Sequence, residues 1–282
     1  MVYYQAEPTR VFPWLPMPIV FAAITPHSPL LHHRIGAQHR AKLNNTIAAY
    51  AEVERSLYAA HAETIVVITP HGAVAPDAFT IDIAEQYVGG LQQFGDFSPP
   101  SHWPVDAALI QSLRAADETN RHAPPLMLVH QPTLDYGTVV ALSMLTRHIP
   151  TLAVVPLHIS GLAVVQHWRF GQFLGDQLRA TSRRVACIAS ADLSHRLTND
   201  APSGWSPAGP AFDRQLLELI RRGDAAGIAK LPSEQVAAAM PCGYLPMVTL
   251  LGLLDGIHWV ARVLSYEGPF GVGHLVAELD VA

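Results

Sequence analysis

Short apolar segments rich in β-branched residues recur along the chain, each bounded by proline, glycine or polar residues. Side chains that are apolar at consecutive positions are typical of strands covered on both faces of a sheet. Four such segments are predicted to be buried strands: residues 19–25, 64–69, 151–157 and 185–189. A fifth segment, residues 79–84, alternates apolar and polar side chains, which predicts an edge strand.

Segments with helical patterning lie between these strands. They are residues 41–61, 105–116, 138–148, 162–180, 212–222, 233–240 and 244–254. Strands that alternate with helices form βαβ units, so we predict an α/β fold: a three-layer sandwich whose central, mostly parallel or mixed sheet is flanked by helices. The last segments, residues 258–265 and 270–279, predict a terminal antiparallel hairpin.

No internal repeat, low-complexity tract or linker-like stretch divides the 282 residues, so we expect one domain over residues 1–282. Two long uncharged runs, residues 11–31 and 235–254, are interrupted by prolines, and buried segments explain them better than membrane spans. The first residues lack a cationic segment followed by an apolar core, so we expect no signal peptide.

Composition narrows the class of protein further. Half of the residues are hydrophobic and 15% are charged, which favours a large buried core over disorder. The net charge of −5 provides no basic surface for a phosphate backbone, so we expect no nucleic-acid partner. Two cysteines, Cys187 and Cys242, cannot form a disulfide framework, and we expect a reduced, cytoplasmic protein. The fifteen histidines draw attention to their placement.

Two of these histidines follow predicted strands in the same local context. The first strand ends in Thr-Pro-His at His27, and the second ends in Thr-Pro-His at His71. Proline ends the strand ladder, and the histidine after it is presented at the carboxyl end of the strand. Two imidazoles at neighbouring strand ends can share one metal ion. The alternative is two loop histidines that cap nearby carbonyl groups.

A third histidine, His195, follows the strand at residues 185–189, with Asp192 three positions before it. A carboxylate beside a histidine can hold the imidazole in one tautomer and prepare it for proton transfer. The alternative is a helix start capped by Asp192 or Ser194, with His195 in the first turn. Two further histidines, His158 after the strand at residues 151–157 and His274 in the terminal hairpin, are predicted to be hydrogen-bonded structural residues, with lining of the cleft as the alternative.

Cys242 lies directly before the apolar helix predicted at residues 244–254. A cysteine at a helix N-terminus experiences the positive end of the helix dipole, so we expect a lowered thiol pKa. A thiolate is both a nucleophile and a soft metal ligand. The alternative is a small buried apolar residue, which is how we interpret Cys187 inside its strand.

Taken together, these motifs give the chain a resemblance to the class III extradiol ring-cleavage dioxygenases, the protocatechuate 4,5-dioxygenase β-subunit superfamily with its Memo relatives. His27 and His71 match the two iron-binding histidines of that family, and residues 190–195 resemble the segment with the acid–base histidine. Residues 134–138, with Tyr136, resemble its Asp-His-Gly-Thr turn. Three further segments resemble a bacterial and archaeal branch linked with Memo and radical-SAM proteins: residues 204–207, 209–213 and 265–271.

The resemblance implies a ferrous, non-haem iron site held by two histidines and one carboxylate, with positions open for a catechol-like aromatic diol and dioxygen. It suggests His27 and His71 as ligands and His195 as the acid–base residue. Asp192 would orient His195 or support the ligands. Members of this family often assemble, so a homo-oligomer is also expected.

Two departures from the family pattern widen the functional prediction. Cys242 occupies the segment where ring-cleaving members carry a glutamate ligand, and a His2Cys site suits zinc, copper or iron. Tyr136 replaces an active-site histidine; it can donate a hydrogen bond but is a poor base near pH 7. The alternative functions are a Memo-like metal-binding protein in redox or partner regulation without ring cleavage, and a thiol enzyme using Cys242 with His195.

Overall fold

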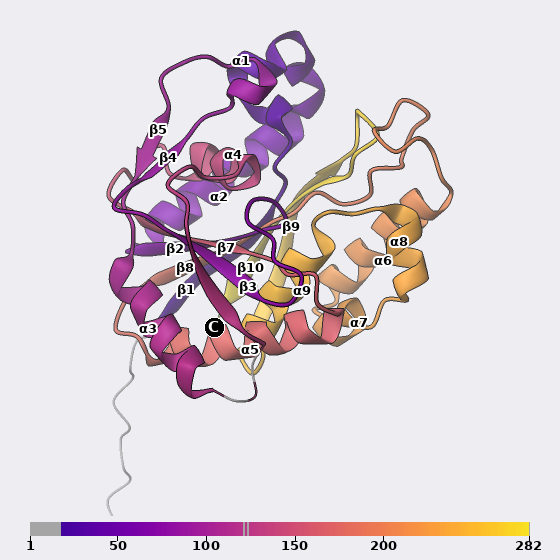
Figure 1. The fold of residues 1–282 in the computed structure, drawn as a ribbon. Helices are drawn as coiled ribbons and strands as arrows, with labels where there is room; N and C mark the ends of the chain where they lie inside the picture. Colours follow the sequence, from indigo (N-terminus) through magenta and orange to yellow (C-terminus); the bar gives the residue numbers. More distant parts are fainter. Residues whose placement is uncertain (1–17, 121, 123, 282) are drawn as a thin grey trace, which may run out of the picture.

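The computed structural model describes residues 18–120, 122 and 124–281, and a mixed sheet of eight strands lies at its centre (Figure 1). The strands run in the order β6-β3-β7-β2-β8-β1-β10-β9. Their bounds are β1 Ile19–Thr25, β2 Thr64–Thr69, β3 Phe79–Ile83, β6 Leu126–His130, β7 Ala153–His158, β8 Val185–Ser190, β9 Trp259–Glu267 and β10 His274–Val281. The central strands β7, β2, β8 and β1 are parallel, so their carboxyl ends meet at one edge of the sheet.

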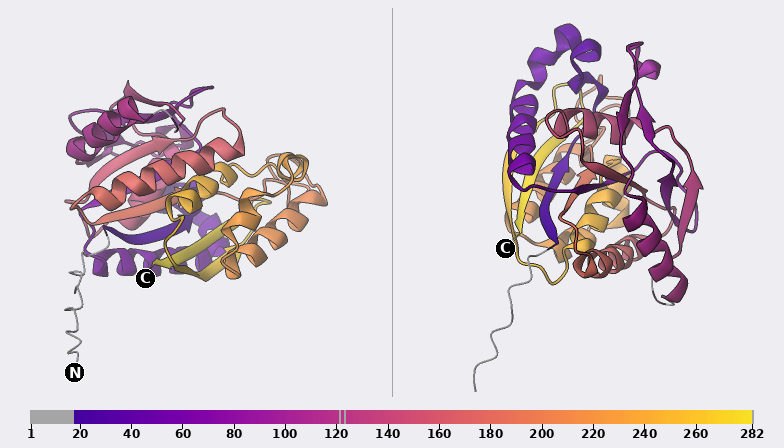
Figure 2. Two further views of the ribbon diagram at one scale, coloured as in Figure 1. Left: turned by 90° about the horizontal axis from the view of Figure 1, so that it is seen from below. Right: turned by 90° about the vertical axis from the view of Figure 1, so that its left-hand side faces the viewer.

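Helices cover both faces of this sheet, which confirms the predicted three-layer α/β sandwich (Figures 1 and 2). On one face lie α2 (Asn44–Ala59) and α4 (Tyr136–Leu145). The other face is covered mainly by α3 (Ala107–Thr119), α5 (Val164–Ala180), α6 (Ala208–Arg221) and α9 (Tyr244–Leu253). The short helices are α1 (His33–Gly36), α7 (Ala225–Ala229) and α8 (Ser233–Ala239).

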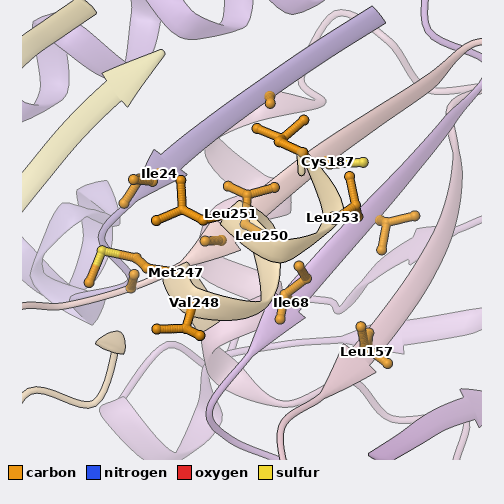
Figure 3. Packing of buried hydrophobic residues seen from close by; sticks show 14 of the residues in the cluster. Ile24, Ile68, Leu157, Cys187, Met247, Val248, Leu250, Leu251 and Leu253 are labelled. Carbon is orange, nitrogen blue, oxygen red and sulfur yellow. The ribbon is translucent and has the colours of Figure 1, made fainter. Parts of the chain in front are cut away.

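Helix α9 is buried on all sides because it lies between the sheet and α5. Figure 3 shows its side chains against Ile24, Ile68 and Cys187, which come from three neighbouring strands. A Cβ atom at Gly171 of α5 would lie 2.3 Å from the carbonyl oxygen of Thr249, so only glycine permits this close helix pair. Cys187 is fully buried, as predicted for a small apolar residue, and burial raises the pKa of its thiol. The packing of α9 fixes the position of the Cys242 loop that leads into it.

The structure corrects the predicted edge strand at residues 79–84. Strand β3 lies inside the sheet, between β6 and β7, and its polar side chains are buried. Thr80 donates to the Ala73 carbonyl at 2.6 Å, and Asp82 faces His158 of β7. Polar and apolar side chains alternate in β3 because the polar ones have buried partners, and not because one face is exposed to solvent. Strand β6 forms the edge of the sheet on this side.

Other element boundaries shift, while most predicted elements are confirmed. The predicted helix at residues 41–61 is a 3-10 segment, Ala37–Leu43, followed by α2. The terminal hairpin is present as β9 and β10. The short pair β4 (Tyr87–Gly89) and β5 (Ser101–Trp103) escaped prediction because three residues carry little periodic signal.

Within the described residues, no helix is both long and apolar enough to cross a membrane. The uncharged run at residues 235–254 contains most of α8 and all of α9. Residues 11–17 of the other uncharged run lie outside the described part of the chain. The expectation of no signal peptide also concerns residues 1–17, which are not described.

Candidate metal centre

Three side chains that are distant in the sequence meet where the parallel strands end. His27 follows β1, His71 follows β2, and Cys242 precedes α9. The Nε2 atoms of the two histidines are 3.1 Å apart, and Cys242 Sγ lies 3.3 Å from His27 Nε2. The three potential ligand atoms all lie within 4.8 Å of one another. The structure thus brings together the three residues predicted as ligands.

The spacing of these atoms fits a single bound cation. Ligand atoms bonded to one ion at about 2.0–2.3 Å lie roughly 3–3.8 Å from each other. The separations at His27 Nε2 fall in this range. Two histidines and one cysteine suit zinc, copper and iron, so the donor chemistry also fits. Their role as metal ligands stays a prediction.

The tautomer of His27 follows from its hydrogen bonds. Ser190 Oγ lies 2.9 Å from His27 Nδ1 and donates its own proton to the Gly137 carbonyl oxygen, also at 2.9 Å. Ser190 must therefore accept the proton of His27 Nδ1, which leaves a lone pair on Nε2. That lone pair faces His71, so a shared proton or a cation is required between the two rings.

His71 is held in place by its neighbours on α4 and β7. The Tyr136 ring stacks on it with centroids 4.3 Å apart, and the Tyr136 hydroxyl lies 2.7 Å from His71 Nε2. Burial and the charge of His27 lower the pKa of His71 to about 4, so this imidazole is neutral near pH 7. Burial raises the pKa of the Tyr136 hydroxyl, which makes Tyr136 a hydrogen-bond donor and not a base, as predicted.

His158 is hydrogen-bonded to the loop that carries His71. Its Nδ1 donates to the His71 carbonyl oxygen at 2.5 Å, and its Nε2 lies 2.9 Å from the Asp82 carboxylate. Burial opposes the charge on His158, but Asp82 outweighs it, and the pKa of His158 is raised. The expectation that His158 is a hydrogen-bonded structural residue is confirmed.

Asp192 is buried and serves the ligand His27 directly. Its Oδ1 accepts the His27 backbone N–H at 3.0 Å, and its Oδ2 lies 3.6 Å from His27 Nε2. Burial raises the pKa of Asp192, but the neighbouring His27 and His274 outweigh it, so the net shift is downward. The ionised carboxylate therefore adds negative charge beside the predicted metal ligands.

His195 is oriented by a backbone carbonyl rather than by Asp192. Its Nδ1 donates to the Met240 carbonyl oxygen at 2.6 Å, which leaves a lone pair on Nε2. That Nε2 atom lies 4.0 Å from Cys242 Sγ, on the side of the predicted ligands. No helix begins at residues 190–195, so the helix-cap interpretation of this segment is wrong. The arrangement suits a group that takes up and returns a proton.

One loop positions both His195 and Cys242. Residue Met240 ends α8 in a left-handed conformation, with φ of 54°, and turns its carbonyl toward His195. The Gly243 N–H donates to the Asp192 carbonyl oxygen at 2.8 Å. A Cβ atom at Gly243 would lie 2.5 Å from Ala191 Cα, so glycine is required for the two segments to approach.

The prediction of a lowered thiol pKa for Cys242 is wrong. Burial, followed by the charge of Asp192, raises this pKa. The residue precedes Gly243, the N-cap of α9, so it does not occupy the first helical turn. The thiol is therefore protonated near neutral pH in the absence of a cation, which weighs against a thiol enzyme that uses Cys242 with His195.

Two residues near the site were missed by the sequence analysis. Asp213 of α6 accepts the Ser194 N–H at 2.9 Å and the Tyr266 hydroxyl at 2.7 Å, and so holds the segment before His195. Both Asp213 and Tyr266 belong to the distinctive segments noted above.

His274 is buried with no hydrogen bond to either ring nitrogen from the described residues, contrary to the predicted bonded role. No local signal marks its burial.

We expect an Asp213→Asn variant to change the pH dependence of stability. Burial raises the pKa of Asp213 to about 6, so the folded protein holds this proton more tightly than the unfolded chain. The wild-type protein should therefore lose about 3 kcal/mol of stability relative to the variant as the pH rises from about 3 to 7. Urea unfolding of both proteins across this range measures the difference. Parallel pH curves would contradict the assignment.

The chain is similar to several known proteins. The family model described as the catalytic LigB subunit of aromatic ring-opening dioxygenase matches residues 21–277. A 2,3-dihydroxyphenylpropionate/2,3-dihydroxicinnamic acid 1,2-dioxygenase of Burkholderia vietnamiensis is 27% identical over 241 residues, which cover 67% of this chain and 75% of that enzyme. An enzyme of the same name from Paraburkholderia phymatum is 28% identical over 238 residues, 66% of this chain and 74% of the enzyme.

A Clostridium acetobutylicum protein is 27% identical over 265 residues, 91% of this chain. The match covers only 56% of that relative, so the chain spans little more than half of its length. Among solved structures, an uncharacterized Escherichia coli protein matches with a TM-score of 0.61 and 17% identity, covering 92% of this chain and 99% of the other. At this identity the structural match supports the fold alone.

Proposed function

The chain belongs to the family of catalytic LigB subunits of aromatic ring-opening dioxygenases, and we propose that it is a metal-dependent, extradiol-type dioxygenase acting on a catechol-like or related small aromatic diol. The observation that carries the proposal is the meeting of His27, His71 and Cys242 beside His195. The relatives named as dihydroxyphenylpropionate dioxygenases make substituted catechols the first substrates to test.

In this proposal His27, His71 and Cys242 hold the metal, with ferrous iron as the first candidate. Ferrous iron held by these three residues would supply binding positions for a diol and dioxygen and redox chemistry between them. The Nδ1–H bond of His27 to Ser190 and the stacking of His71 on Tyr136 fix the two rings in the orientation that ligation requires.

The protein side chains supply proton transfer and substrate orientation. His195 has a free lone pair on Nε2, because its Nδ1 proton is bound to the Met240 carbonyl, and it can take the proton of a bound diol. The Tyr136 hydroxyl stays protonated and can donate a hydrogen bond to a substrate oxygen. The buried Asp192 carboxylate offsets the positive charge that develops on His195 when it takes up a proton.

A second function is favoured by one observation, the thiol in place of a carboxylate ligand. With Cys242 the chain resembles Memo-like proteins, so a His2Cys site that binds zinc or copper in redox or partner regulation is the alternative. In that case tight metal binding is retained without ring cleavage.

Anaerobic loading with ferrous iron, followed by a panel of catechols in air, tests the proposal. We expect oxygen uptake and a ring-opened chromophore, with 2,3-dihydroxyphenylpropionate included in the panel. The Cys242→Glu variant restores the family's carboxylate and is expected to retain or gain turnover. If neither protein consumes oxygen although both bind iron, the dioxygenase proposal fails. Zinc or copper binding that is lost in Cys242→Ser would then support the alternative.

A further inference from the structure

A second group of basic side chains lines a cavity of about 470 Å³ that is separate from the metal centre. Helix α4 connects the two places. It begins at Tyr136 beside the predicted ligands and ends next to Thr146 and Arg147, which line the cavity. Ten helical residues span about 15 Å, so a molecule in this cavity would not touch the metal ligands.

The titratable side chains that line this cavity are all basic, and two of them, Arg40 and Arg147, carry a permanent positive charge. Its basic residues are His32, His33, Arg40, His102 and Arg147, and no Asp or Glu is among the described residues that line it. The whole chain carries a net charge of −5, so this concentration of basic groups is local. A concave surface lined by one sign of charge concentrates the opposite ion.

One carboxylate, that of Asp96, lies beside this region. Asp96 Oδ2 lies 3.4 Å from His32 Nδ1, and Asp96 Oδ1 lies 3.5 Å from Arg34 Nη1, so one acid is shared by two basic residues. The pKa of His32 is lowered, first by burial and then by the positive charge of His33, with Arg34 and Arg147 adding to it. The positive charges of Arg34 and Arg147 beside His32, unlike its burial, also attract an anion.

Several hydrogen-bond donors at the cavity are available to such an anion. Arg147 is exposed and forms no ion pair with any carboxylate in the described part of the chain. Arg40 Nε donates to the Leu31 carbonyl oxygen, which fixes this guanidinium at the cavity. Guanidinium and imidazole groups, together with the hydroxyl of Ser101, are the donors that recognise phosphate oxygens.

We propose that this cavity is a binding site for a small organic phosphate, held by Arg147, Arg40 and His102. The volume lies within the range of cavities that hold small molecules and exceeds what one inorganic ion requires. A nucleic acid fits less well, since its extended charge meets the net negative charge of the chain, whereas a small anion experiences the field within about 10 Å.

Titration calorimetry with inorganic phosphate and with phenyl phosphate, at constant ionic strength, tests the site. We expect one saturable site per chain, with phenyl phosphate displacing inorganic phosphate. The Arg147→Gln variant should bind about tenfold more weakly or worse, because a charged hydrogen bond is lost. The matched control Arg55→Gln removes an exposed guanidinium from α2 and should bind as the wild-type protein does.

The site would be disproved by equal binding in Arg147→Gln and Arg55→Gln, or by the absence of saturable phosphate binding. Tight binding of a single-stranded oligonucleotide that phenyl phosphate fails to displace would also overturn it in favour of a nucleic-acid surface. Measurement of the thermal melting point checks that each variant is folded. His102→Gln provides a second test, with weaker phosphate binding expected in a protein that retains both arginines.

Discussion

Replacing His71 by alanine is expected to lower the affinity for ferrous iron and zinc by more than about a hundredfold, since loss of a supporting residue alone costs up to that factor. The reason is geometric: His71 Nε2 faces His27 Nε2 at 3.1 Å and is one of the three assigned ligand atoms. His71 is only half-buried, so the variant should fold. Metal content after loading and dialysis measures the effect.

A matched control variant and a spectroscopic measurement test the same ligand assignment. The His130→Ala variant removes an exposed histidine at the end of β6 and should bind metal as the wild-type protein does. Cobalt bound to a thiolate gives a charge-transfer band, which should be present in the wild-type protein and missing in Cys242→Ser. Full metal stoichiometry in His71→Ala, or an unchanged cobalt spectrum in Cys242→Ser, would contradict the assigned ligands.

Replacing His195 by glutamine is expected to lower the turnover number by about 10²–10⁴-fold with a diol that the iron-loaded wild-type protein cleaves. His195 has a lone pair on Nε2 facing the site, and glutamine can bond to the Met240 carbonyl but cannot carry a proton between two groups. Metal content should be unchanged, because His195 is not one of the three assigned ligands. Steady-state oxygen uptake at saturating diol measures the change.

The outcome for His195→Gln separates proton transfer from support of the loop. If turnover falls while iron binding and the melting point stay unchanged, the imidazole acts in the reaction. A turnover number within twofold of the wild-type value would show that another group moves the proton. Asp213→Asn is a useful comparison because Asp213 is hydrogen-bonded to this segment through the Ser194 N–H. It should alter stability with pH more than it alters turnover.

Local patterns were sufficient for most of the long elements and for the residues at strand ends, but they missed strands β4, β5 and β6. The apolar β-branched segments gave the central strands, and a proline after each strand marked the positions of His27 and His71. The pattern failed at residues 79–84, because a buried ion pair with His158 makes an inner strand alternate like an edge strand. It also failed at His274, whose burial depends on packing against distant segments.

The sequence alone determined the α/β class, the resemblance to ring-cleavage dioxygenases and the identity of the candidate ligands, because each rests on local periodicity or a short motif. The tertiary structure decided how these groups behave. Cys242 and His27 meet although 215 positions separate them, and the pKa of the thiol is raised, not lowered, by burial and Asp192. The orientation of the His195 ring likewise depends on its hydrogen bond to the Met240 carbonyl, which belongs to a distant segment. Burial and hydrogen-bond partners are set by residues far apart in the chain, so no local pattern could specify them.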